Sequence, residues 1–249
     1  MRNGDKFIFT AASIDAGTSI TLGAKITGDA SGAADGAYMS DISFSSTLIN
    51  PLLAGDIYTF GSFLSGDVNL VSLDWRVLSV DEANNRALLV TEQAVTKMAY
   101  QTAGNSYNWS TSDVKTWLNG TGDNQFLKGF STEEKARILK VSITDGTEGQ
   151  NKNSSTIIAP NQSADGLDSV FLLSVADVGG YFSNNGYNDD DRKCTLLTDS
   201  SVCKWWLRSP GKDDNTRVAQ IDDDGVVDDD GSFVTNIIGV RPAVWIKLK

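Results

Sequence analysis

Two short runs of aspartate near the carboxyl end of the chain have the clearest capacity for chemistry. Residues 222–224 are aspartates followed by Gly225. The same pattern returns at residues 228–230, which are followed by Gly231. Carboxylates at this density could bind a hard cation, act as general acid and base, or present charge to a partner.

Four interpretations of these runs are open. Charge runs usually face water, so a solvated acidic loop is the first. A calcium site is the second, although the runs lack the alternate spacing and the bidentate Glu of an EF-hand loop. Catalytic carboxylates are the third, but nothing in the sequence selects one pair of acids. The fourth is a ligand-binding surface.

The absence of histidine limits the chemistry of the whole 249-residue chain. It excludes Ser-His-Asp and Cys-His arrangements and the H-E-x-x-H zinc motif. Cys194 and Cys203 are the only cysteines, too few for a four-ligand zinc site. The pair could be two free thiols or a local disulfide that closes the loop between them, and the sequence leaves both open.

The net charge is strongly negative, with 32 acidic and 21 basic residues, a formal charge of −11 and a pI near 4.4. We therefore expect no nucleic-acid partner, because binding phosphates requires clustered Lys and Arg. We also expect no membrane insertion, because no apolar run approaches the roughly 20 residues of a membrane span. The amino terminus does not read as a signal peptide.

The elements that must position these residues begin near Gly55. Strand-like runs occupy residues 57–60, ending at Gly61, and residues 73–80 and 86–91. Helices are predicted after a cap at Ser110 or Ser112, after the capping box of Ser131 and Glu134, and from about Ser174 to Val178. Residues 144–166 and 184–192 are predicted loops. Because strands and helices mix without a regular βαβ alternation, we expect an α+β fold.

Residues 1–53 differ in composition from the rest, being rich in small residues and free of Trp. Their short alternating patches predict a β-rich N-terminal extension, which could serve as an assembly arm. A single larger domain is expected over residues 54–249.

The carboxy-terminal cassette, residues 204–246, supplies a family resemblance. It opens with K-W-W-L-R-S-P-G at residues 204–211, contains the two D-D-D-G runs, and closes with G-V-R-P-A at residues 239–243. This frame resembles the variable region of the variable proteins of diversity-generating retroelements, which have the formylglycine-generating-enzyme subtype of the C-type lectin fold. The similarity extends more loosely back to about Gly55.

The resemblance implies a C-type lectin-like ligand-binding (receptor-recognition) domain whose cassette displays hypervariable side chains. In that family, mutagenesis of adenines rewrites Asn codons, and Asp, Ser, Thr, Ile, Val and Phe are all reachable from AAC or AAT in this way. We expect Trp205, Trp206, Leu207 and Trp245 in the core. We also expect structural hydrogen bonds from Arg208 and Arg241, and turns with positive φ at Gly225 and Gly231.

The predicted contact surface consists of the cassette residues that the frame leaves variable. Among them Phe233 is the expected aromatic anchor, and Ile237 could add apolar contact. The carboxylates would favour Lys- or Arg-rich partner surfaces. The full set is Asp213, Asp214, Asn215, Thr216, Gln220, Asp222, Asp223, Asp224, Val227, Asp228, Asp229, Asp230, Ser232, Phe233, Thr235, Asn236 and Ile237.

An enzyme is the least favoured class. Cys194 and Cys203 differ in spacing and place from the cysteine pair of the formylglycine-generating enzymes, so the resemblance does not carry their activity over. We expect no catalytic residue, metal or cofactor, and an unknown protein or surface ligand as partner. The alternatives are a calcium-dependent carbohydrate-binding lectin and a structural protein of a virion or surface. The family suggests a virion-associated or cytoplasmic protein.

Overall fold

The computed structural model describes residues 52–65, 69–103, 107–141, 168–184, 188–211 and 216–248, which fall within the unit Ile49–Lys249. The strands are β1 (Ile57–Ser65), β2 (Asn69–Asp81), β3 (Arg86–Thr91), β4 (Thr96–Met98), β5 (Ile138–Leu139), β6 (Trp205–Pro210), β7 (Arg217–Ile221), β8 (Val227–Phe233), β9 (Ile238–Val240) and β10 (Ala243–Lys247). The helices are α1 (Asp113–Asn119), α2 (Thr132–Arg137), α3 (Val175–Asn184) and α4 (Asp189–Arg192), with 3-10 turns η1 (Glu82–Asn84), η2 (Trp109–Thr111) and η3 (Phe126–Gly129).

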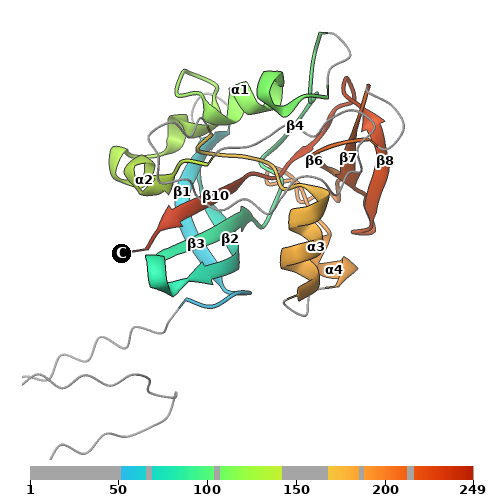
Figure 1. The fold of residues 1–249 in the computed structure, drawn as a ribbon. Helices are drawn as coiled ribbons and strands as arrows, with labels where there is room; N and C mark the ends of the chain where they lie inside the picture. The colour runs from blue at the N-terminus through green and yellow to red at the C-terminus, as the bar shows by residue number, and fades with distance from the viewer. Residues whose placement is uncertain are drawn as a thin grey trace, which may run out of the picture. The chain divides into compact units, whose positions relative to one another are not determined.

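The strands form two five-stranded sheets (Figure 1). The first has the order β1-β2-β3-β10-β5, and the second has the order β4-β9-β6-β7-β8. Neighbours pair antiparallel except β6 and β9, which are parallel. In Figure 1 the strands β6, β7 and β8 lie at the right, and β1, β2, β3 and β10 lie at the left. The prediction of an α+β fold is confirmed at this level.

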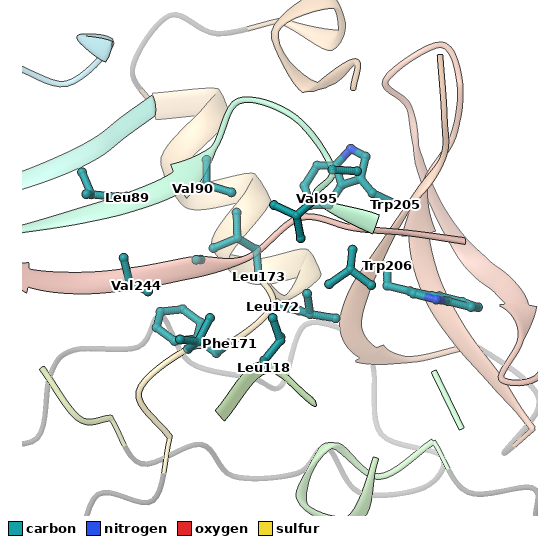
Figure 2. Packing of buried hydrophobic residues seen from close by; sticks show 14 of the residues in the cluster. Leu89, Val90, Val95, Leu118, Phe171, Leu172, Leu173, Trp205, Trp206 and Val244 are labelled. Carbon is teal, nitrogen blue, oxygen red and sulfur yellow. The ribbon is translucent and has the colours of Figure 1, made fainter. Parts of the chain in front are cut away.

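One hydrophobic core connects the two sheets. Trp205 and Trp206 of β6 are fully buried. Figure 2 shows Leu172 and Leu173, from the segment before α3, between Val244 of β10 and Trp206. The sequence analysis placed Trp205, Trp206, Leu207 and Trp245 in the core, and all four are buried.

Two helix starts follow from local sequence signals. The Ser112 side chain accepts a hydrogen bond from Lys115 N at 3.1 Å, and α1 ends at Gly120. Before α2, Ser131 and Glu134 form the predicted capping box. Ser112, Ser131 and Glu134 each accept a hydrogen bond from a backbone N–H group that has no partner within the helix.

Three predicted boundaries were wrong. Strand β1 does not end at Gly61 but continues to Ser65 through a register shift, with Gly61 at a φ of 68°. Helix α3 continues through Gly179 and Gly180 to Asn184, because burial of Val178 and Phe182 outweighs the low helix propensity of glycine. The predicted loop 184–192 contains α4, whose first turn is capped by Asn188.

Several predictions concern residues outside the described ranges. These are the β-rich extension 1–53 apart from its last two residues, the loop 144–166, and the contact residues Asp213, Asp214 and Asn215. They remain predictions.

Candidate ligand-binding surface

The first frame of the cassette is fixed by its tryptophans. On β6, Trp205 Nε1 donates to the carbonyl of Arg192 at 2.9 Å, and Trp206 Nε1 donates to the carbonyl of Met98 at 3.0 Å. The Trp206 ring also packs edge-on against Tyr100, with 5.8 Å between centroids. Buried indoles with satisfied N–H groups act as core residues, so they are not available to stack on a ligand.

Arg208 connects β6 to the helix α3. Its guanidinium is buried, donates to the carbonyl of Leu172 at 2.8 Å and forms an ion pair with the buried carboxylate of Asp177. The Ser209 hydroxyl accepts a hydrogen bond from Val175 N at 3.0 Å. The first frame therefore anchors the start of α3, as the prediction of a structural Arg208 requires.

Arg241 fixes the second frame in the same way. Its Nε donates to the carbonyl of Thr91 at 2.6 Å, and its Nη1 donates to the carbonyl of Arg192 at 3.4 Å. The guanidinium carbon lies 5.0 Å from the ring centroid of Trp205, within the range of a cation–π contact. Both predicted structural arginines are therefore confirmed.

The first D-D-D-G run forms the tight turn between β7 and β8. Asp222 Oδ1 accepts hydrogen bonds from Asp224 N and Val226 N, each at 3.0 Å. Gly225 has a φ of 84°, and a Cβ there would lie 1.9 Å from the carbonyl oxygen of Asp189 in α4. Asp223 and Asp224 are exposed. The turn therefore uses Asp222 for its geometry and projects the next two carboxylates.

The second D-D-D-G run lies on β8 and repeats this arrangement. Asp228 Oδ1 accepts a hydrogen bond from Gly231 N at 3.0 Å, and its Oδ2 accepts one from Gln220 Nε2 at 2.8 Å. Gly231 has a φ of 71° and packs against the Val218 carbonyl. Asp230 is exposed. The predicted positive φ values at Gly225 and Gly231 are thus confirmed.

The opposite end of the β7–β8 hairpin carries the apolar part of the predicted surface. Phe233 is 46% exposed and Ile237 is 65% exposed. The guanidinium carbon of Arg217 lies 4.1 Å from the Phe233 ring centroid, and Arg217 Nη1 donates to the carbonyl of Gly231 at 2.9 Å. Arg217 was not among the predicted contact residues, although its cross-strand pairing with Phe233 positions that ring.

The predicted contact residues that the structure describes therefore form a stripe, not one compact cluster. Exposed side chains lie in the turn at one end of the hairpin and in the turn after Phe233 at the other. Between them runs β8, which is the edge strand of its sheet. The half-buried members are Thr216, Asp222, Val227, Asp228, Asp229 and Ser232. Gln220 is buried at 2% exposure and supports Asp228 from beneath.

A cavity of about 610 Å³ lies beside the aspartate turn. Its walls combine Asp223 and Asp224 with Glu92, Gln93, Lys193, Cys194, Thr195 and Val202. Sequence reasoning did not select the last six as ligand contacts. They lie outside the cassette, at residues 92–93, 193–195 and 202, and no local motif marks them.

The two cysteines are both free thiols and both buried. The question that the sequence left open is thereby answered for this structure in favour of free thiols. Among the described residues no group of three or more Cys, Asp or Glu side chains is arranged to hold a metal ion. Within the same ranges, no helix is both long and apolar enough to cross a membrane.

The fold and the surface together define an α+β domain in which two buried frames hold an exposed, acidic hairpin. A family model described as "Domain of unknown function (DUF6273)" matches residues 84–248, which is more than half of the chain. The chain belongs to this family. The match includes the whole cassette and excludes residues 1–83. No curated protein and no solved structure matches the chain.

Proposed function

We propose that this protein is a non-enzymatic ligand-binding protein that recognises its ligand through the stripe along the β7–β8 hairpin. The observation that carries the proposal is that one short segment contains both residues that pack in the core and residues that face solvent. The frames at residues 205–209 and 238–246 are buried, whereas the turns between them expose their side chains. Exposed residues on a rigid scaffold can change without loss of the fold.

The finer fold assignment is part of the same proposal. We infer the formylglycine-generating-enzyme subtype of the C-type lectin fold from the two frames and their spacing in the sequence. Burial of both frames and the structural use of Arg208 and Arg241 support this assignment.

The charge of the stripe favours a basic partner. Asp223, Asp224 and Asp230 are exposed and have no basic side chain bound to them among the described ion pairs. Phe233 and Ile237 add apolar area at the far end. A Lys- or Arg-rich protein surface would complement this pattern, with association fastest at low ionic strength.

Binding of a lysine-rich peptide tests the class of partner. The variant replaces Asp223, Asp224 and Asp230 by Asn, and its matched control replaces the exposed acids Glu82, Asp123 and Glu133 by their amides. Both variants lose the same charge. Titration at low salt should show about tenfold weaker binding for the first variant only. Equal weakening in both would attribute binding to net charge and contradict a contact role for the stripe.

Diversification by a retroelement is the remaining part of the proposal, and the flanking DNA tests it. We expect a nearby reverse transcriptase gene and a near-copy of the cassette with Asn codons at the positions of residues 222–224 and 228–230. Flanking DNA without either feature would contradict diversification and would leave the binding proposal standing.

A further inference from the structure

The backbone places Cys194 and Cys203 directly opposite each other. Thr195 and Val202 form an antiparallel bridge, and Cys203 N donates to the carbonyl of Cys194 at 3.0 Å. Directly opposed residues of an antiparallel pair have Cα atoms about 4.5 to 5.5 Å apart. Disulfides form at Cα separations of about 4.4 to 6.8 Å. The expected Cα separation of the pair therefore lies within the range in which disulfides form.

The two side chains differ in how readily they lose a proton. The Cys203 thiol donates a hydrogen bond to Cys194, and this bond, with the Arg241 guanidinium and the Ala94 N–H, lowers the pKa of Cys194 to about 7. Burial and the Glu92 carboxylate oppose the shift. The Ala94 N–H lies 3.0 Å from Cys194 Sγ. Cys194 is therefore the more acidic thiol of the pair.

Cys203 is held in the protonated state. Donation to Cys194, burial and the negative charges of Cys194 and Asp223 raise the pKa of Cys203, against the opposing effect of Lys97. A low-pKa thiol beside a protonated one is the arrangement of an attacking and a resolving cysteine.

Access to the pair is also unequal. Cys194 forms part of the wall of the 610 Å³ cavity, whereas Cys203 is not among the residues that line it. Lys193 also lines the cavity, but its ammonium group pairs with Asp190, and the carboxylates of Glu92, Asp223 and Asp224 give the walls a net negative charge. The cavity therefore favours a small cationic disulfide over an anionic one.

We propose that Cys194 and Cys203 form a redox-active dithiol site that exchanges with small cationic disulfides of the cystamine class. The Cys194 thiolate attacks one sulfur of the reagent, forms a mixed disulfide and displaces the other half as a thiolate. Cys203 then loses its proton to water and attacks Cys194 Sγ. The intramolecular disulfide forms, and the second half of the reagent leaves as a thiolate. The protein loses two electrons, and one reagent disulfide becomes two thiols.

This site is independent of the ligand-binding proposal, but it lies against the same turn. Arg192, two residues before Cys194, donates from Nε to the carbonyl of Gly225 at 2.8 Å. A mixed disulfide in the cavity would lie beside Asp223 and Asp224.

The experiment treats the reduced full-length chain and two variants, Cys203→Ser and Cys194→Ser, with cystamine. The products are read by intact mass and by peptide mapping after alkylation. The wild type should lose both titratable thiols and form an intramolecular disulfide that dithiothreitol reverses. Cys203→Ser should retain one cysteamine on Cys194, because no thiol resolves the mixed disulfide. Cys194→Ser should react at least about tenfold more slowly, since its remaining thiol stays protonated.

The rate of alkylation of Cys194 in a third variant, Cys203→Ala, and in the wild type gives a second readout, because a serine hydroxyl would still donate to Cys194. In the wild type the rate should rise with pH to a midpoint near 7, and loss of the donating thiol should move that midpoint upward. Thermal melting confirms that each variant is folded. The proposal is overturned if both wild-type thiols stay titratable, if Cys194→Ser reacts as fast as Cys203→Ser, or if the disulfide formed joins two chains.

Discussion

The first aspartate of each D-D-D-G run binds the backbone, and the last one is exposed. Asp222 accepts two backbone hydrogen bonds, and Asp228 accepts one from the backbone and one from Gln220. The internal repeat of the sequence therefore repeats a backbone-bonded first aspartate and a glycine with positive φ, as well as charge. Substitution of the exposed carboxylates should consequently lower the free energy of unfolding least. These are Asp223, Asp224 and Asp230.

Gly225→Ala should destabilise the protein by at least about 2 kcal/mol, because the left-handed conformation disfavours a side chain and the new Cβ would overlap the Asp189 carbonyl. Gly179→Ala is the matched control. A Cβ at Gly179 meets nothing within 4 Å, so this helical substitution should stabilise the protein by about 0.5 to 1 kcal/mol. Urea denaturation measures both changes. Equal effects of the two substitutions would contradict the assigned turn.

Arg208→Ala should cost about 3 to 5 kcal/mol, because it leaves the buried carboxylate of Asp177 without its cation. Lys128→Ala removes the exposed partner of Asp123 and should cost less than about 1 kcal/mol. The two free energies of unfolding can be compared in the same denaturant series. A small cost for Arg208→Ala would argue against a structural role for the first frame.

At the scale of helices and strands, sequence patterns within a few residues predicted the helix starts correctly. Contacts between distant parts of the chain leave no such pattern in the sequence. Ser112, Ser131 and Glu134 act on backbone groups three residues away, so the sequence pattern alone located those helix starts. Helix α3 passes through Gly179 because Phe182 is buried by distant parts of the chain. The cavity joins Glu92 and Lys193 to Asp223, and no pattern within one segment could reveal that contact.

Glu134 supplies a pH-dependent contribution to stability. Burial raises the pKa of Glu134, but hydrogen bonds from Ser131 and Gly61 lower it by more than burial raises it. The net pKa of Glu134 is therefore below that of an ordinary glutamate. A depressed pKa stabilises the fold above the unfolded pKa, and this contribution is lost as pH falls through the folded pKa. Glu134→Ala should therefore cost about 1 kcal/mol near pH 7 and less near pH 3.

The control for this prediction is Glu133→Ala on the same helix. It leaves the capping box intact and should change stability little at either pH. Chemical denaturation at pH 7 and pH 3 gives the comparison. A cost for Glu134→Ala that grows on acidification would contradict the assigned hydrogen bonds.

At the scale of the whole molecule, the two frames connect the hairpin to both sheets. The frame containing Trp205 belongs to the second sheet, and β10, which follows Arg241, lies within the first. The acidic charge of the chain, −11 overall, is partly concentrated on the segment that these frames hold outward. The sequence resemblance predicted the buried frames correctly. It did not predict that the contact residues form a stripe with a cavity at one end.

The most direct test is a displayed library in which the exposed cassette residues vary while the frames stay constant. Six positions are randomised in the cassette library, and six exposed positions remote from it are randomised in the control library. The cassette positions are Asp223, Asp224, Asp230, Thr235, Asn236 and Ile237, and the control positions are Glu82, Ala83, Thr121, Asp123, Lys128 and Glu133.

Both libraries are selected against one immobilised globular protein such as lysozyme, and the Kd and Tm of the recovered clones are measured. We expect folded binders with Kd at or below about 1 μM from the cassette library and none from the control. A cassette library that unfolds, or that yields no more binders than the control, would contradict the central claim.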